Sequence, residues 1–399
     1  MELAQRNYQN ASAGLEALFA ASNPSVISFA GGYPDRKLFP TRELNQAFAH
    51  SFSGSDPELL QYASASGFQP LRQKLATRMQ QDGMTVTDQD VLLTQGAQQG
   101  IDLTARLLLN VGDGLVVEGP TYVGALAAFD AYQPTYYAVP VEADGMDLHA
   151  LQKVLMTKSV KLIYTIPDFQ NPTGTVMSLA KRQALIALAN QYDVMILEDG
   201  PYRDLRYSGS NLPTLQSLDT QGRVIFLGSF SKILAPSLRL GWLVAQPELL
   251  HHLTALKGGV DVESSNLMMH GINAYLEHND LNAHIQQIRA CYFEKKNLMV
   301  TTLRQHLPAG CTVNDPDGGF FLWLQLPADF DAEAFMNAIL MPQANVSFVP
   351  ASVMIPGAGM TNGARLNFTG PTLAQIKTGA SALCEALSQA LAQPQRLRR

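Results

Sequence analysis

The segment SFSKILAPSLRLGW holds the most reactive combination of side chains in this 399-residue sequence. Two hydroxyls and two cations fall within eleven residues of it, namely Ser229, Ser231, Lys232 and Arg239. Hydroxyls and a guanidinium can bind a phosphate dianion, which leaves the lysine amine available for reaction. A lone lysine is more often a solvated surface charge, but Lys232 lies between two apolar runs and near Pro236. We therefore expect a phosphate-binding segment with a reactive amine.

A second candidate for phosphate binding is LTQGAQQG, which has the pattern of a strand, a glycine turn and a helix start. The unpaired backbone N–H groups at such a helix start suit a phosphate. The spacing is not a nucleotide fingerprint, and a tight turn with a helix cap has the same pattern. Both interpretations stay open on this motif alone.

Two further motifs, IPDFQNPTG and ILEDGPY, follow apolar runs. A carboxylate that ends an apolar strand is costly to bury without a positive partner. Asp199 could therefore pair with a protonated ring nitrogen or form a salt bridge with a basic side chain. Asn171 could line a site or simply make an Asx-turn within Asn-Pro-Thr-Gly.

Seven apolar runs predict the strands that would position these residues. They are Val91–Thr94, Leu115–Glu118, Thr135–Val139, Lys161–Ile166, Val194–Glu198, Val224–Leu227 and Leu240–Ala245. Helical patterns such as Gln98–Leu109 and Leu179–Tyr192 separate several of them. Nearly continuous apolar strands that alternate with helices are typical of a mostly parallel sheet covered on both faces.

The candidate residues follow these strands at corresponding positions. Those at or just past the carboxyl end of a predicted strand are Gly96, Tyr122, Asn171, Asp199 and the segment Ser229–Lys232. In open α/β sheets, ligands bind at that edge. We therefore expect one site assembled from five strand ends.

A chain of 399 residues is too long for one ordinary core, which predicts two domains. Hydrophobic residues make up 46% and charged residues 16%, which is typical of a well-packed α/β enzyme. We expect an N-terminal arm with part of a small domain at residues 1–45, a large domain at 46–290, and the C-terminal small domain at 291–399. A helix over Asn282–His306 would link the last two. The elements predicted outside the large domain are a helix at Leu15–Ala21, strands at Phe320–Gln325, Val346–Val349 and Ala364–Phe368, and a helix at Leu373–Leu391.

Other classes of protein find little support. The net charge of −6 gives no electrostatic reason to expect nucleic acid as a partner. No apolar run approaches the roughly 18–20 residues that a membrane helix needs, and the N-terminus lacks the order of a signal peptide. The cysteines, Cys291, Cys311 and Cys384, have no metal-ligand spacing, so we expect no metal and a reducing, cytoplasmic location.

Taken together, the motifs resemble those of the class I/II aminotransferases, which are pyridoxal-phosphate (PLP) enzymes of fold type I. The resemblance rests on NPTG, EDGPY, SFSK and PSLRLGW in the order and spacing of that family, and it runs from FAGGYPD to ARLNF. ISFAGGYPD, LQYASASGFQPLR and PDFQNPTGT are most similar to the branch with 2-aminoadipate and kynurenine aminotransferases. The resemblance implies a large domain with a mostly parallel, seven-stranded sheet and a smaller α/β domain formed from both termini.

The resemblance also implies roles around the cofactor ring. Lys232 would carry PLP as a Schiff base and later move the substrate proton. Asp199 would keep the pyridine nitrogen protonated, which makes the ring an electron sink. Tyr202 and Asn171 would hydrogen-bond the phenolic oxygen, and Tyr122 would stack on the ring.

Other implied contacts concern the phosphate and the substrate. The phosphate would be held by Ser229, Ser231, Arg239 and the backbone of Gly96, Ala97 and Gln98. Tyr62 would reach the phosphate of a second chain, so that a homodimer has composite sites. Arg365 would bind the substrate α-carboxylate, and Gly32 and Asn171 would line the substrate pocket.

Two positions depart from the resembling proteins. Ala97 stands where relatives often carry a hydroxyl, which would remove one phosphate contact. Leu15 stands where aminoadipate-type relatives carry an arginine, so an acidic donor would lose its partner and an apolar donor would gain one. We therefore expect an aromatic or large aliphatic amino donor, with 2-oxoglutarate as acceptor.

Two alternatives remain. A β-lyase or decarboxylase reaction could use the same fold and cofactor, because one fold hosts many chemistries. An effector-sensing transcription regulator could contain the same domain, but such relatives carry a helix-turn-helix ahead of it. Only about 25 residues precede ISFAGG here, so we expect an enzyme.

Overall fold

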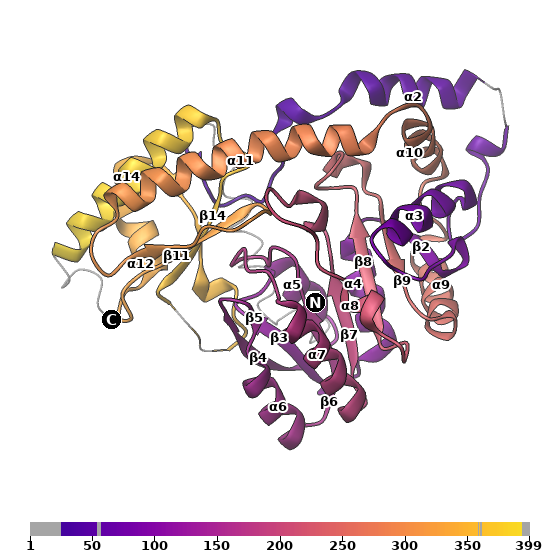
Figure 1. Cartoon of the computed structure of the whole chain (residues 1–399), viewed down its shortest axis with the longest axis horizontal. Helices are drawn as coiled ribbons and strands as arrows, with labels where there is room; N and C mark the ends of the chain where they lie inside the picture. The colour runs from indigo at the N-terminus through magenta and orange to yellow at the C-terminus, as the bar shows by residue number, and fades with distance from the viewer. Residues whose placement is uncertain (1–24, 54–56, 358, 360, 393–399) are drawn as a thin grey trace, which may run out of the picture.

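The computed structural model describes residues 25–53, 57–357, 359 and 361–392. Its larger sheet contains all seven predicted strands and a short eighth one (Figure 1). In spatial order these are β2 (Val91–Thr94), β9 (Gly241–Val244), β8 (Val224–Ser229), β7 (Met195–Asp199), β6 (Val160–Thr165), β3 (Gly114–Gly119), β4 (Thr135–Glu142) and β5 (Gly145–Met146). The mostly parallel sheet is thereby confirmed: neighbours from β8 to β4 are parallel, whereas β9 is antiparallel to β8 and β2, and β5 to β4.

Helices cover both faces of this sheet because its strands are apolar on both sides. Alternate strand residues enter two separate cores, with Leu197 in one and Ile196 in the other. One face carries α4 (Ala97–Leu108), α5 (Val123–Asp130) and α9 (Pro247–Asp261). The other carries α6 (Leu148–Thr157), α7 (Leu179–Tyr192) and α8 (Leu215–Leu218).

A smaller antiparallel sheet lies beside the larger one (Figure 1). Its order is β10 (Thr312–Val313), β11 (Phe321–Gln325), β14 (Gly363–Asn367) and β13 (Val349–Pro350). Strand β1 (Ile27–Ser28) pairs in parallel with β12 (Val346–Ser347), so an early segment of the chain joins a late one here. The single strand predicted over Val346–Val349 is therefore divided between two sheets, and the intervening Phe348 is buried against Phe335.

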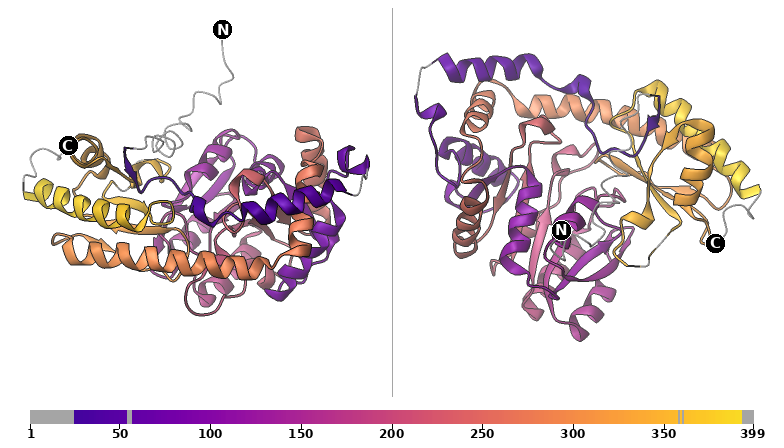
Figure 2. Two further views of the ribbon diagram at one scale, coloured as in Figure 1. Left: turned by 90° about the horizontal axis from the view of Figure 1, so that it is seen from above. Right: turned by 180° about the vertical axis from the view of Figure 1, so that it is seen from behind.

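The remaining helices connect and cover the two sheets. They are α2 (Thr41–Ser53), α3 (Gln69–Gln81), α10 (Asn266–His278), α11 (Leu281–His306), α12 (Ala332–Phe335), α13 (Met341–Ala344) and α14 (Leu373–Ala392). Helix α11 runs from the side of the larger sheet to that of the smaller one, where α14 packs on it (Figure 2). Short helical turns occur at η3 (Arg36–Leu38), η4 (Pro57–Leu60), η5 (Asp88–Asp90), η6 (Arg203–Leu205), η7 (Pro236–Leu238), η8 (Met336–Leu340) and η9 (Ala351–Val353).

The domain limits stay predictions. Those expected after residues 45 and 290 lie within α2 and α11, which reach from one part of the molecule towards the other. The predicted helix Leu15–Ala21 lies outside the described residues. Within the described part of the chain, no helix is both long and apolar enough to cross a membrane.

Candidate active site

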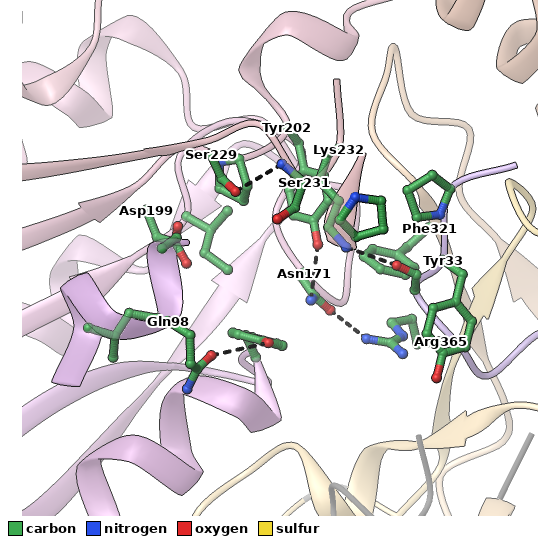
Figure 3. A pocket seen from close by; sticks show the side chains of 18 of the residues that line it. Tyr33, Gln98, Asn171, Asp199, Tyr202, Ser229, Ser231, Lys232, Phe321 and Arg365 are labelled. Atoms are coloured by element: carbon green, nitrogen blue, oxygen red, sulfur yellow. Dashed lines mark hydrogen bonds between the residues drawn. The ribbon is translucent and has the colours of Figure 1, made fainter. Parts of the chain in front are cut away.

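The carboxyl ends of the parallel strands and the smaller sheet enclose a cavity of about 350 Å³ (Figure 3). Small-molecule sites commonly have about 300–1,000 Å³. Twelve residues singled out from the sequence line it: Gly32, Ala97, Gln98, Tyr122, Asn171, Asp199, Tyr202, Ser229, Ser231, Lys232, Arg239 and Arg365. Asp199 and Gln98 lie on one side of the cavity, Arg365 and Phe321 on the other, and Asn171 between them (Figure 3).

Lys232 lies in the turn that follows β8 and projects into this cavity. Its Nζ donates a hydrogen bond to the Gly32 carbonyl oxygen at 2.9 Å and lies 5.3 Å from the centre of the Phe320 ring. Burial, and then the positive charges of Arg365 and Arg239, lower the pKa of Lys232 to about 8. Roughly a tenth of this amine is therefore unprotonated, and nucleophilic, at pH 7, far more than for an unperturbed lysine with a pKa near 10.4.

Asp199 is the last residue of β7, and only one of its two carboxylate oxygens has a hydrogen-bond partner among the described residues. Oδ2 accepts a hydrogen bond from the Tyr164 hydroxyl at 2.8 Å. Oδ1 is buried and has no hydrogen-bond partner among the described residues. Burial raises the pKa of Asp199 to about 6. Because a buried polar atom is normally paired, Oδ1 indicates a missing donor in the cavity.

A chain of hydrogen bonds joins the two sheets across the cavity (Figure 3). Arg365 Nη1 donates to Asn171 Oδ1 at 2.9 Å, and Asn171 Nδ2 lies 3.4 Å from the Tyr202 hydroxyl oxygen. Arg365 Nη2 donates to the Ala30 carbonyl, and the guanidinium lies 4.3 Å from the centre of the Phe321 ring. Arg365 Nε is buried with no partner among the described residues. Burial lowers the pKa of Arg365 to about 10, so the guanidinium stays charged at neutral pH.

The opposite end of the cavity gathers the groups expected to bind phosphate. Ser229 Oγ accepts the Ser231 N–H at 3.1 Å, and Arg239 Nη2 donates to the Gln95 carbonyl at 3.2 Å. Gly96 caps α4 with a φ of 73°, and a Cβ there would come within 2.8 Å of Arg239 Nη2. The α4 N-terminus, two hydroxyls and a guanidinium thus face one region, which suits an anion.

Tyr122 and Gln98 form the adjoining wall. The Tyr122 hydroxyl lies 3.4 Å from Gln98 Oε1, and Gln98 Nε2 donates to the Gly124 carbonyl at 2.5 Å. Ala97 lines the cavity beside them with a methyl group only.

Two expected residues are not part of the cavity lining, and a third falls outside the described residues. Gly96 adjoins it through Arg239, as described above. Tyr62 does not line the cavity of its own chain, and its side chain is 77% exposed. Leu15 lies outside the described residues.

The sequence interpretation missed several residues of the site. Those that line the cavity are Tyr33, Ile101, Ile166, Pro201 and Phe321. Tyr164 was also missed, although a tyrosine within an apolar strand requires a partner for its hydroxyl. Tyr33 follows the double glycine of FAGGYPD, which was the available signal.

Comparison with known proteins agrees with this geometry. The chain matches Aminotransferase class I and II over residues 26–383, and it belongs to that family. It is 36% identical to aromatic-amino-acid aminotransferase 1 of Thermococcus litoralis, over 94% of this chain and 91% of the relative.

Two solved structures are similar over 98% of both chains. The multiple substrate aminotransferase of Thermococcus profundus superposes with a TM-score of 0.92 at 34% identity. The α-aminoadipate aminotransferase of Thermus thermophilus, with a TM-score of 0.90 at 32% identity, was solved with N-(5′-phosphopyridoxyl)-L-leucine. The chain is therefore a fold type I aminotransferase, and its cofactor is PLP.

The residues present fit that cofactor. A protonated pyridine nitrogen would supply the donor that Asp199 Oδ1 lacks. The amine of Lys232 suits attachment of an aldehyde, and the hydroxyls, Arg239 and the α4 N-terminus suit a phosphate. When bound, PLP supplies an electron sink for the α-carbon of an amino acid.

Proposed function

We propose that the protein transfers the amino group of an aromatic or large aliphatic L-amino acid to 2-oxoglutarate, with PLP held as a Schiff base on Lys232. One observation carries the proposal. Lys232, Asp199 and Arg365 line a single cavity, and Asp199 Oδ1 and Arg365 Nε have no hydrogen-bond partner among the described residues. An amine, an acceptor for a ring nitrogen and a cation for a carboxylate are what amino transfer requires.

Each side chain then has a defined task. With PLP bound, the amine of Lys232 would act as the general base that takes the proton from the substrate α-carbon and would later return a proton. Asp199 would accept a hydrogen bond from the ring nitrogen and keep it protonated. Asn171 and Tyr202 would hydrogen-bond the phenolic oxygen, and Tyr122 would lie against the ring.

At the phosphate end, Ser229, Ser231 and Arg239 donate to the phosphate together with the backbone of residues 96–98. A hydroxyl at position 97 would add one donor, and Ala97 lacks it. Arg239 contributes most, because a charged donor forms roughly twice as strong a hydrogen bond as a neutral one.

Arg365 binds the substrate α-carboxylate, and apolar residues beside it receive the donor side chain. Its Nε has no protein partner among the described residues, and the Phe321 ring packs on the guanidinium. Tyr33, a half-exposed aromatic residue of the cavity lining, extends this wall, and Gly32 keeps it open because a Cβ would lie 3.0 Å from Phe321 Cζ. The name of the Thermococcus litoralis relative and the leucine adduct of the Thermus thermophilus structure support apolar donors.

The distal carboxylate of the acceptor, 2-oxoglutarate, also needs a positively charged partner. Among the described lining residues, the cations are Lys232, Arg239 and Arg365, and all three already have tasks. The distal carboxylate of 2-oxoglutarate therefore needs a group from elsewhere, either a second chain or the segment that contains Leu15.

A homodimer with composite sites completes the proposal. Tyr62 is 77% exposed and lies close in sequence to Leu60, which is 74% exposed. Ala63 N–H donates to Glu263, which follows the exposed Val260 and Val262. These four side chains, Leu60, Tyr62, Val260 and Val262, define an apolar patch that a second copy would cover. The patch would place Tyr62 within reach of the partner's phosphate.

We also propose a reducing, cytoplasmic location. Cys291, Cys311 and Cys384 are all unpaired, which is usual where thiols are kept reduced.

The test is a panel of amino donors with 2-oxoglutarate, followed through the keto acid products. We expect phenylalanine, tyrosine, leucine or methionine to give the highest kcat/KM. If 2-aminoadipate exceeds all of them by about tenfold, the donor class is wrong, since tenfold corresponds to about 1.4 kcal/mol of transition-state binding. Products that form without an acceptor keto acid would indicate a lyase or decarboxylase instead. Borohydride reduction followed by peptide mapping must place the pyridoxyl group on Lys232.

A further inference from the structure

Two buried side chains below the cavity, Glu118 and Gln170, have no task in the proposed chemistry. Each is only 1% exposed. Glu118 is the second-last residue of β3, and Gln170 stands in the loop after β6, within the motif IPDFQNPTG. Burying a carboxylate is costly, so its hydrogen bonds need an explanation.

Glu118 holds the carboxyl end of the neighbouring strand β6. Its Oε1 accepts from the Thr165 hydroxyl at 2.8 Å, and Oε2 accepts from the Ile166 N–H at 3.2 Å. Oε2 also accepts from Gln170 Nε2 at 3.1 Å. Burial still raises the pKa of Glu118 to about 7, although all three hydrogen bonds lower it.

Gln170 extends this connection to two loops. Its Nε2 also donates to the Pro120 carbonyl at 2.8 Å, in the loop that leads to Tyr122. Its Oε1 accepts from the Thr173 N–H at 2.8 Å and from the Thr173 hydroxyl at 2.7 Å, and thereby closes the turn that contains Asn171. One amide thus joins the loops that follow β3 and β6.

These two loops carry three residues of the cavity lining, Tyr122, Ile166 and Asn171. Asn171 in turn accepts from Arg365 and contacts Tyr202. Glu118 itself points away from the cavity, since Val116, two residues earlier on the same strand, packs in the core on the other face of the sheet. It therefore cannot touch the substrate.

We propose that Glu118 and Gln170 are positioning residues, which act as a clamp that fixes Asn171 and Tyr122 against the cofactor and Arg365. The proposal rests on the roles proposed above for Asn171 and Tyr122. Loss of the clamp lets Asn171 move, which alters its hydrogen bond to the cofactor and its hold on Arg365. Both the cofactor's absorption and the KM for the donor then change.

Glu198 offers a matched control. It is also the second-last residue of a parallel strand, β7, is also 1% exposed, and burial also raises its pKa to about 7. It accepts the N–H groups of Leu215 and Gln216 at 3.0 and 2.9 Å, so it holds α8 rather than a loop of the cavity.

The experiment compares the holoenzymes of wild type, Glu118→Leu, Glu118→Gln, Gln170→Leu and Glu198→Leu. We measure the melting temperature, kcat and KM, and the pKa at which the absorption band of the bound cofactor changes. In Glu118→Leu we expect kcat/KM to fall at least about tenfold, since a displacement of 1 Å can cost about a hundredfold. We also expect the band pKa to shift by at least about half a unit, because a hydrogen bond to the cofactor changes.

Glu118→Gln should restore both properties to within about threefold and a few tenths of a unit, because its amide oxygen can accept from Ile166 and Gln170 while its NH₂ donates to the Thr165 hydroxyl. Glu198→Leu should lower the melting temperature but leave the band pKa unchanged. If Glu118→Leu and Glu198→Leu change the band pKa equally, the clamp is overturned.

Gln170→Leu decides the matter if Glu118→Leu does not fold, because a wild-type band pKa and KM in that variant also overturn the clamp. Asn171→Ala separates the clamp from the proposed roles. If Asn171→Ala leaves the band pKa unchanged, the role of Asn171 fails. If it shifts the band pKa and the clamp variants do not, the clamp alone fails.

Discussion

At Lys232, the charges of the cavity act on a single amine. Burial and the two guanidinium groups lower its pKa to about 8, whereas an unperturbed lysine has a pKa near 10.4. Only the unprotonated amine attacks an aldehyde. The rate at which cofactor-free protein takes up PLP should therefore rise with pH and level off above about 8. Stopped-flow absorbance over the range from pH 6 to 10 measures this midpoint.

Two substitutions at Arg365 separate charge from burial. Arg365→Gln removes a positive charge, so the pKa of Lys232 and the midpoint of uptake should move to higher pH. Arg365→Lys keeps the charge and should leave the midpoint near 8. A midpoint near 10 in the wild type would contradict the environment described for Lys232.

Burial shifts the pKa of Asp199 in the direction opposite to that of Lys232, because it raises the pKa of this carboxyl to about 6. At pH 4 the carboxyl is protonated in the folded state and about half protonated in the unfolded state, so it contributes only a small difference. Above pH 6 the folded, cofactor-free protein contains a buried carboxylate, which lowers its free energy of unfolding by up to about 3 kcal/mol for a shift of about two units. Asp199→Asn should therefore stabilise the cofactor-free protein at pH 8 and not at pH 4.

The same substitution should abolish most activity, because asparagine cannot keep the ring nitrogen protonated. Melting temperatures of the cofactor-free proteins at the two pH values test the first part, and kcat/KM tests the second. An equal gain in stability at pH 4 and pH 8 would show that the charge of Asp199 is not its cause.

Lys232, Asp199 and the tyrosines Tyr122 and Tyr202 could be predicted from the sequence, whereas Tyr33 and Phe321 could not. A lysine or an aspartate beside an apolar strand is conspicuous, because burial of its charge is costly. Tyr33 and Phe321 look like ordinary apolar residues until the smaller sheet is placed over the larger one. Glu118 and Gln170 were missed for a different reason, since their hydrogen-bond partners come from a neighbouring strand end and cannot be paired from the sequence.

At the scale of elements, the turn between β2 and α4 joins backbone conformation to phosphate binding. Gly96 has a φ of 73°, and a Cβ would displace Arg239. Gly96→Ala should weaken PLP binding and also destabilise the fold by about 1–3 kcal/mol, because a φ of 73° with a ψ of 173° is a conformation essentially restricted to glycine. Gly83→Ala is the control, because its φ is 90° and its Cβ would meet nothing within 4 Å.

Fluorescence titration with PLP and denaturant unfolding test the pair of variants. Both should lose stability because both have a positive φ, and only Gly96→Ala should lose affinity for PLP. Equal affinities for PLP would mean that the turn does not hold Arg239 in a binding position.

Long elements could be predicted better than short ones. The seven strands of the larger sheet and α11 follow from apolar runs and periodicity that extend over several residues. Strand β5 has two residues and was not predicted, whereas β12 and β13, with two residues each, were predicted as one strand. The partners of such short strands are set by their neighbours in space, so the local pattern did not show where one strand ends and the next begins.

At the scale of the whole molecule, the exposed patch of Leu60, Tyr62, Val260 and Val262 is the surface that the proposed homodimer would cover. Tyr62→Phe would remove one hydroxyl from each of the proposed composite sites. A hydrogen bond to a charged group contributes roughly 1.5–3 kcal/mol, so the affinity for PLP should fall about ten- to hundredfold. Analytical ultracentrifugation should show a dimer whose dissociation is promoted by charged substitutions within the patch.

Subunit exchange tests the composite site directly. In a mixed dimer of Lys232→Ala and Tyr62→Phe, one site combines an intact Lys232 with an intact Tyr62, and the other site carries both defects. Random exchange of equal amounts should therefore restore about one quarter of all sites, because half of the dimers are mixed and each has one sound site. Lys232→Ala mixed with Asp199→Ala is the control, since these two residues belong to the same chain's share of the site and every mixed site keeps one defect. Activity at limiting PLP should rise on mixing only in the first pair. Recovery in both pairs, or in neither, would place Tyr62 outside the partner's active site.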